Sequence, residues 1–133
     1  MRVDSDINFG TNVRPIPIAT TNSNLADYQF VLAIKLIRTH AGTSEQLSAV
    51  ELRTINQGRC ETIYGLNFVS ASMLCAGWET GGRRSCRGDI GAPLIHNNAV
   101  VGVTAYTYGC GDGNYPSIYS RVSRYASWII SNA

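Results

Sequence analysis

The sequence predicts an all-β fold, a small antiparallel barrel or sandwich that ends in a single helix. Two observations carry this prediction. Short segments rich in β-branched residues alternate with turn residues such as Gly, Asn and Pro along most of the 133 residues, a pattern typical of small barrels and sandwiches. Near the C-terminus the apolar residues instead recur at helical spacing. A chain of this length is expected to form one domain.

The start of the chain predicts a connector followed by a buried strand. Residues 1–24 are expected to be extended, and residues 25–133 to be the folded domain. Pro15 and Pro17 disfavour a helix because proline lacks a backbone N–H and restricts the residue before it. Residues 29–37 are the most apolar run, short and bounded by turn residues, so we expect a buried strand there.

The middle of the chain predicts a second strand and then irregular segments. After a loop at 39–45, polar and apolar residues alternate from Val50 onward, which indicates a half-buried strand over 46–55. A turn is expected at 56–61 and a single helical turn at 62–65.

The last third of the chain predicts a hairpin, a strand and the helix. Residues 94–95 and 99–106 are β-prone and flank a turn at 96–98, so they predict a hairpin. Residues 117–122 predict a final strand. A helix is expected over 123–131, with its first residue, a serine, as the N-cap.

Composition and charge argue against several classes of function. Hydrophobic residues make up 44% of the chain, charged residues make up 15%, and the net charge is +2. Arg83, Arg84 and Arg87 form the only local basic cluster, which is too small to predict nucleic-acid binding. No apolar run approaches the ~20 residues of a membrane-spanning helix, and no signal peptide is visible. We therefore expect neither a nucleic-acid partner nor a membrane.

The cysteines favour disulfides over a metal site. The four are Cys60, Cys75, Cys86 and Cys110. None of them forms a C-x-x-C pair, whereas zinc sites usually take two ligands from one tight turn. The histidines, His40 and His96, lie in polar stretches and are expected to be solvated loop residues. We therefore expect no metal and no cofactor, and two disulfides would imply an oxidising compartment.

The stretch 86–93, with the sequence CRGDIGAP, carries the strongest functional signal. Gly88 and Gly91 lie on either side of Asp89 and allow a tight turn with outward-pointing N–H groups. Such a turn builds an oxyanion-binding nest from the main chain. The position where this loop would present a nucleophile is Ile90, whose side chain has no oxygen or sulfur. The sequence therefore predicts the oxyanion-binding turn of a catalytic site, but not its nucleophile.

Several motifs together resemble the C-terminal half of a trypsin-like (chymotrypsin-family) serine protease, most like the digestive trypsins of insects and mites. They are NVRPI at 12–16, MLCAG at 73–77, CRGDIGAPL at 86–94, YGC at 108–110, YPSIYSRV at 115–122 and WI at 128–129. The resemblance implies the second Greek-key β-barrel of that fold with its C-terminal helix, and a connector that corresponds to the segment between two barrels. It also implies the disulfides Cys60–Cys75 and Cys86–Cys110, one of the three pairings open to four cysteines.

By this resemblance, Ile90 stands where the family has its catalytic serine. The family's histidine and aspartate would precede residue 1, and Asp4 and Asp6 are too close to the NVRPI segment to be that aspartate. No intact triad is therefore expected. The backbone N–H groups of Gly88 and Ile90 would still form an oxyanion hole, since backbone donors do not depend on the side chain.

The resemblance also implies a changed specificity pocket. The family's acidic floor position matches Arg84, which reverses its charge. Thr107 and Ser117 match wall positions that are usually glycine, and Tyr106, next to Ala105, matches the usual tryptophan. Either this pocket favours an acidic or small side chain, or Arg84 is a solvated arginine beside an unused pocket; the second interpretation is preferred.

The surroundings of Asp89 are changed as well. In the family this carboxylate pairs with the ammonium of a newly cleaved N-terminus, and the corresponding cleavage motif is not found here. A disordered, zymogen-like loop is expected because a buried unpaired charge is costly. A glycine-flanked tryptophan near this loop in the family is replaced by residues 35–37, Lys-Leu-Ile.

The favoured hypothesis is a secreted, non-catalytic protease homologue that binds a protein or peptide. The alternative is a truncated fragment of a secreted serine-type endopeptidase without independent function, and hydrolysis through unidentified residues is a third. Because the motifs match only the second of two barrels, an exposed face is expected to need a first barrel or self-association to cover it.

Overall fold

The computed structural model describes residues 3–39, 42–65, 67–78, 80–82, 86, 89–109 and 113–133, without the side chains of 36–39 and 42–45. The described strands are β1 (Phe30–Thr39), β2 (Gly42–Ile55), β3 (Met73–Gly77), β4 (Pro93–His96), β5 (Ala99–Tyr106) and β6 (Ser117–Arg121). The described helices are α1 (Gln57–Tyr64) and α2 (Val122–Asn132).

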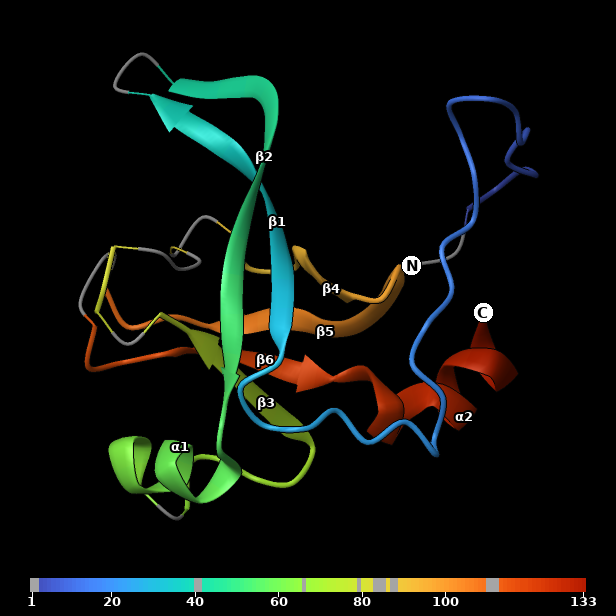
Figure 1. The fold of residues 1–133 in the computed structure, drawn as a ribbon. Helices are drawn as coiled ribbons and strands as arrows, with labels where there is room; N and C mark the ends of the chain where they lie inside the picture. Colours follow the sequence, from blue (N-terminus) through green and yellow to red (C-terminus); the bar gives the residue numbers. More distant parts are fainter. Residues whose placement is uncertain are drawn as a thin grey trace.

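The described strands form one closed antiparallel barrel in the order β1, β2, β3, β6, β5, β4 (Figure 1). β1 closes it by pairing with β4, where Leu32 lies opposite Ile95. Closure leaves no strand edge exposed along the barrel. The predicted all-β fold, an antiparallel barrel with a C-terminal helix, is confirmed.

The β1–β2 hairpin is longer than predicted. Thr39 lies opposite Gly42, so β2 begins at Gly42 and the loop expected at 39–45 is wrong. The long pairing with β1 extends β2 through residues that have no strand pattern of their own. In Figure 1 the far end of this hairpin reaches beyond the other strands.

The helix α1 begins earlier than predicted. Asn56 is its N-cap, and the Asn56 Oδ1 accepts a hydrogen bond of 3.1 Å from Arg59 N. The helix therefore starts at Gln57, where we expected a turn, and spans eight residues, where we expected a single turn. An asparagine favours both turns and helix N-caps, so the sequence alone does not separate the two.

The helix α2 begins directly at the end of β6. Its N-cap is Arg121, which makes no side-chain capping hydrogen bond, so the expected cap at Ser123 is wrong. Ser123 is instead a buried residue of the first turn. Among the described residues, neither helix is long and apolar enough to cross a membrane.

Arg121 links three elements through its side-chain hydrogen bonds. Its Nε donates to Met73 O at 3.1 Å, and its Nη2 donates to Gln57 Oε1 at 3.0 Å. Burial lowers the pKa of Arg121 from its ordinary value, the positive charge of Arg124 lowers it further, and Asp27 opposes this effect. The guanidinium still remains charged near neutral pH. The arginine therefore links the ends of β6 and β3 to α1.

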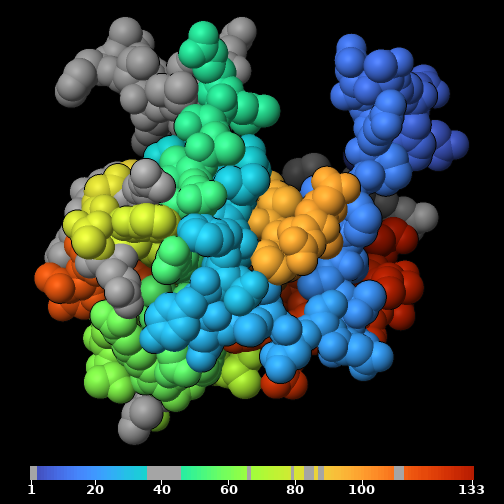
Figure 2. All heavy atoms as spheres, in the orientation of Figure 1, coloured from blue at the N-terminus to red at the C-terminus, as the bar shows by residue number. Residues whose placement is uncertain are grey.

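The N-terminal segment, residues 3–17, is exposed throughout. Figure 2 shows the start of the chain in blue, standing apart from the rest of the molecule. The segment reaches the barrel at Ile18, which forms a parallel bridge with Val100. There Val100 N donates to Pro17 O, and Ala19 N donates to Val100 O, both at 2.9 Å. The division of the chain at residues 24 and 25 stays a prediction.

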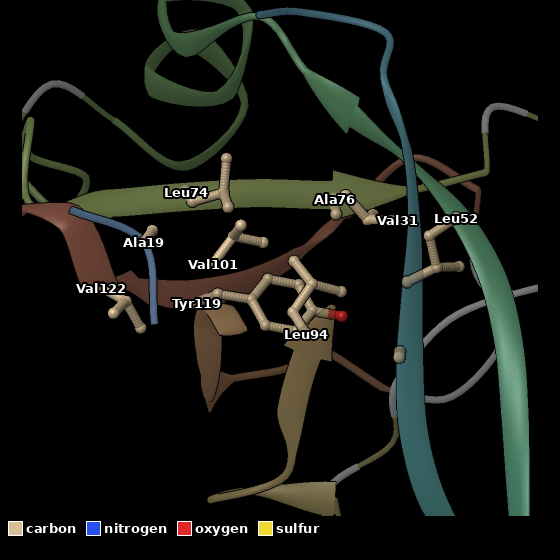
Figure 3. Packing of buried hydrophobic residues seen from close by; sticks show 10 residues of the cluster. Ala19, Val31, Leu52, Leu74, Ala76, Leu94, Val101, Tyr119 and Val122 are labelled. Atoms are coloured by element: carbon tan, nitrogen blue, oxygen red, sulfur yellow. The ribbon is translucent and has the colours of Figure 1, made fainter. Parts of the chain in front are cut away.

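The barrel encloses the main hydrophobic core, with Tyr119 and Leu94 near its centre (Figure 3). Its buried members are Ala19, Val31, Ala33, Leu52, Leu74, Ala76, Leu94, Val101, Tyr119 and Val122. A second cluster surrounds the disulfide between α1 and β3 and contains Ile55, Cys60, Val69, Cys75 and Ile118. The main core includes Leu94 of β4 and Val101 of β5, the two strands that carry the candidate site.

Candidate functional site

The described part of the 86–93 stretch is a hydrogen-bonded turn built around Asp89. Cys86 N donates to Asp89 Oδ2 at 2.6 Å, and Asp89 N donates to Cys86 O at 2.8 Å. Ala92 N then donates to Asp89 O at 2.9 Å. Gly91 has a φ of +89°, which glycine adopts without strain. The carboxylate therefore holds the turn together through the main chain.

This turn is anchored on β5. Gly91 N donates to Thr104 O at 2.8 Å, and Thr104 N donates to Ala92 O at 2.9 Å. The Thr104 hydroxyl also donates to Ala92 O at 3.0 Å. Ile90 is thereby held at the surface, with 57% of its accessible area exposed. Gly88 lies outside the described residues, so the oxyanion hole and the loop disorder stay predictions.

A hollow of about 460 Å³ opens beside Ile90 at the end of β5. Its described lining is Ile90, Tyr106, Thr107, Tyr108 and Gly109. Thr107 is 7% exposed, and its hydroxyl oxygen is buried without a hydrogen-bond partner in the described structure. Buried hydroxyls are normally paired, and this oxygen has almost no surface exposed to the hollow.

The structure gathers only some of the predicted pocket residues. Tyr106 and Thr107 line the hollow with Ile90. Ala105 is exposed on β5, and Ser117 is buried at the start of β6; neither is among the described lining residues. Arg83, Arg84 and Arg87 lie outside the described residues, so both interpretations of Arg84 stay predictions.

An aromatic cluster adjoins this hollow, and sequence reasoning missed it. The ring centroid of Tyr64 lies 5.9 Å from Phe68, 6.0 Å from Tyr106 and 5.8 Å from Tyr115. Phe68 and Tyr106 are 5.3 Å apart, and Tyr108 and Tyr115 are 4.5 Å apart. The outer rings, those of Phe68, Tyr106 and Tyr108, are exposed. These residues come from α1, the end of β5 and two loops, so no sequence period indicates their contact.

A second hollow, of about 230 Å³, is also lined by Ile90. It is lined by Ile34, Lys35, Leu47, Asp89, Ile90, Ala92 and Pro93. Ile90 is therefore shared by two hollows, one bordered by aromatic rings and the other by the Asp89 carboxylate and a lysine.

His96 is not the solvated loop residue that the sequence suggested. It is the last residue of β4 and half-buried, and its Nδ1 lies 2.8 Å from Phe30 O. Because a carbonyl only accepts, Nδ1 carries the proton. His96 lines a separate hollow of about 410 Å³ together with Asn24 and Gln29, away from Ile90. His40 lies outside the described residues.

The disulfide Cys60–Cys75 joins α1 to β3 as the resemblance implied, with the two Cα atoms 6.3 Å apart. Cys86 is also disulfide-bonded, while Cys110 lies outside the described residues. Within the described chain, no group of three or more His, Cys, Asp or Glu side chains is arranged to hold a metal ion.

Comparison with known proteins agrees with this geometry. The Trypsin family matches residues 1–129. The chain is 42% identical over 138 residues to Trypsin, alkaline A of Manduca sexta, which covers 100% of this chain and 54% of that protein. It is 39% identical over 142 residues to Achelase-1 of Lonomia achelous, covering 100% of this chain and 58% of that protein.

The fold comparison gives the same result. The solved structure of neuropsin, a serine protease expressed in the limbic system of mouse brain, matches with a TM-score of 0.86 and 26% identity. The match covers 98% of this chain and 58% of that one. The chain thus spans about half the length of the curated relatives it matches. These findings confirm the resemblance: the chain belongs to the trypsin family and is homologous to a trypsin-like serine protease domain.

Proposed function

We propose that this chain is a non-catalytic member of the trypsin family that binds a peptide segment of a protein partner without cutting it. The observation that carries the proposal is Ile90, which takes the place of the nucleophilic serine by resemblance and is exposed at the mouth of the site. An aliphatic side chain offers no lone pair for attack on an amide carbonyl.

The position of the described histidine supports the same proposal. A serine or other hydroxyl needs an adjacent base to become a nucleophile. His96 lies at the far end of β4 with its Nδ1 bonded to the Phe30 carbonyl, and it borders a different hollow from Ile90. The described part of the chain therefore places no imidazole beside Ile90.

The surface around Ile90 suits peptide binding. Exposed aromatic rings are enriched in interfaces because they give large contact areas at low cost in conformational entropy. Tyr106, Tyr108 and Phe68 form such a surface next to the hollow. Because Thr107 is bulkier than glycine, a small side chain would fit better than a long cationic one.

The test combines activity with binding. A fluorogenic peptide panel and a fluorophosphonate label should give no signal on the purified, oxidised chain. A displayed peptide library should instead yield ligands whose affinity falls about tenfold or more in Tyr106→Ala. Ile130→Ala, on the exposed side of α2, is the matched control and should bind as well as the wild type.

Two outcomes would contradict the proposal. Peptide turnover that a serine-protease inhibitor blocks would show that the chain is catalytic. A chain that is unfolded by circular dichroism and retains no library peptide would favour the fragment without independent function. The Ile90→Ser variant should still not react with the fluorophosphonate label, because the new hydroxyl would have no base beside it.

We further propose an extracellular location and a covered apolar face. Two disulfide-bonded sites suit an oxidising compartment. Large apolar side chains are exposed on α2 and on the N-terminal segment, including Trp128, Ile130 and Phe9. Sedimentation of the purified chain would detect self-association as a concentration-dependent increase in mass.

A further inference from the structure

The hollow that His96 lines lies between residues 19–29 and the β4–β5 hairpin, apart from the proposed peptide site. Its volume is about 410 Å³, within the range of about 300–1,000 Å³ that is typical of small-ligand sites. Ala19 and Val101, two members of the main core, form part of its apolar lining. The half-buried Leu25 and Ala99 add to it. One side of the hollow is therefore an apolar surface that is continuous with the core.

The polar part of the lining consists of uncharged groups. Asn24, Gln29 and Asn97 each contribute a carboxamide, whose oxygen accepts and whose NH₂ group donates hydrogen bonds. His96 contributes an imidazole. Because its Nδ1 donates to Phe30 O at 2.8 Å, the Nε2 of the neutral ring is an acceptor. The hollow therefore offers hydrogen-bond donors and acceptors next to an apolar surface.

Hydrogen bonds to the barrel hold the wall formed by residues 19–29. Ala19 N donates to Val100 O at 2.9 Å, which fixes the start of this segment to β5. Near its end, the Thr54 hydroxyl accepts from Gln29 N at 2.9 Å and donates to Ala26 O at 2.8 Å. None of these bonds uses a side-chain amide. The hollow is therefore preformed, which lowers the entropic cost of binding a ligand.

These groups favour one class of ligand. A charged ligand would lose water without meeting an opposite charge on the described lining, which is costly. A purely apolar ligand would cover the amides without forming hydrogen bonds to them. A flat nucleobase usually stacks on an aromatic side chain, and the described lining has no Phe, Tyr or Trp. A pyranose sugar fits best, because it has a C–H face for the apolar surface and hydroxyls that both donate and accept.

We propose that this hollow binds one pyranose unit of a neutral sugar, either a free sugar or the end of a glycan. The C–H face of the ring packs on the apolar surface, and neighbouring hydroxyls bond to the carboxamides of Asn24, Gln29 and Asn97. The Nε2 of His96 accepts from a further hydroxyl. This inference goes beyond the proposed function, because the hollow shares no described lining residue with the one between Ile90 and the aromatic cluster.

NMR titration of the isotope-labelled chain tests the proposal. The probes are the methyl glycosides of glucose, galactose, mannose and N-acetylglucosamine. At least one of them should shift the side-chain amide signals of Asn24, Gln29 and Asn97, and the shifts should saturate. The proposal is wrong if no glycoside shifts these signals at about 50 mM, a concentration well above the millimolar Kd of a weak site. Shifts confined to other residues would also contradict it.

Two adjacent asparagines provide a matched pair of variants. Asn97 and Asn98 have positive φ angles of 46° and 60°, so glycine can replace either residue without strain. Of the two, Asn97 lines the hollow and Asn98 does not. Asn97→Gly should therefore weaken glycoside binding about fivefold, and Asn98→Gly should bind as well as the wild type. Equal affinities of the two variants would refute the proposed contact.

Two further ligands test the chemistry and the source of the sugar. The uronic acid that corresponds to the bound sugar adds a carboxylate and should bind about tenfold more weakly. Equal or tighter binding of the uronic acid would contradict a site for neutral sugars. An oligosaccharide that ends in the bound sugar separates the two sources. Tighter binding than that of the methyl glycoside would identify a glycan, and equal or weaker binding would identify the free sugar.

Discussion

The barrel and the N-terminal segment contain similar apolar residues, but only the barrel buries them. Val31 and Leu94, on neighbouring strands, are 1% and 0% exposed. Phe9 and Val13 of the segment are 63% and 49% exposed. Hydrophobicity alone therefore does not decide which apolar residues become core.

Strand pairing makes the difference. Each barrel strand has a partner on both sides, so its inward residues face a closed interior. The segment has one isolated bridge, at Ile18, and one internal backbone hydrogen bond, from Gly10 N to Val13 O. Pro15 and Pro17 also lack the N–H groups that a ladder requires. The candidate site belongs to the barrel, so the positions of its residues depend on this paired part of the chain.

The largest effect should come from the barrel core. Leu94→Ala removes a fully buried side chain from β4, directly next to the turn that carries Ile90. We expect a loss of about 2–5 kcal/mol in the free energy of unfolding, because the cavity refills only in part. Urea unfolding followed by tryptophan fluorescence measures it. Phe9→Ala in the segment is the matched control and should change the stability by about 0.5 kcal/mol or less.

Two glycines provide a second contrast between the regions. A Cβ on Gly102 of β5 would lie 3.0 Å from Tyr119 Cβ and 3.4 Å from Leu94 Cβ. Gly102→Ala should therefore cost about 1–3 kcal/mol through overpacking. A Cβ on Gly10 would meet no atom within 4 Å, so Gly10→Ala should leave the urea midpoint unchanged. Equal effects of the two variants would contradict the proposed difference in packing.

Much of this architecture follows from local sequence signals. The β-branched runs predicted β1, β5 and β6, and the hairpin turn forms at Asn97 and Asn98, both with positive φ. The errors have two different causes. β2 extends to Gly42 because β1, a distant partner, pairs with it there. α1 begins after Asn56 because this side chain caps the helix, a local contact, but asparagine favours turns and helix N-caps alike.

The candidate site was predictable only in its loop. The motif around Asp89 indicated a tight turn, and the resemblance pointed to Ile90, Tyr106 and Thr107, which the structure places around one hollow. The aromatic cluster joins Tyr64 to rings that lie far from it in the sequence. Such contacts depend on barrel closure, which one sequence does not reveal.

A third prediction concerns the junction of the barrel with the end of the connector. Asn56 caps α1 and also donates from Nδ2 to Asp27 Oδ2 at 2.7 Å. Asn56→Ala should lower the unfolding free energy by about 1 kcal/mol, mainly through loss of the cap. Asn56→Ser keeps a capping oxygen but loses the donor to Asp27, so it should recover most of the stability. If Asn56→Ser were as unstable as Asn56→Ala, the bond to Asp27 would be the larger contribution.

The smallest effect should follow deletion of the segment itself. Removing residues 1–16 leaves both hydrogen bonds between Val100 and the chain at Pro17 and Ala19, and the deleted side chains in the described structure are exposed. The unfolding free energy should therefore change by about 0.5 kcal/mol or less. Deletion through Ala19 removes the bridge and a buried side chain and should cost about 1–3 kcal/mol. A large loss from the shorter deletion would mean that the segment packs on the barrel in solution, because exposed apolar residues without pairing cannot contribute that much.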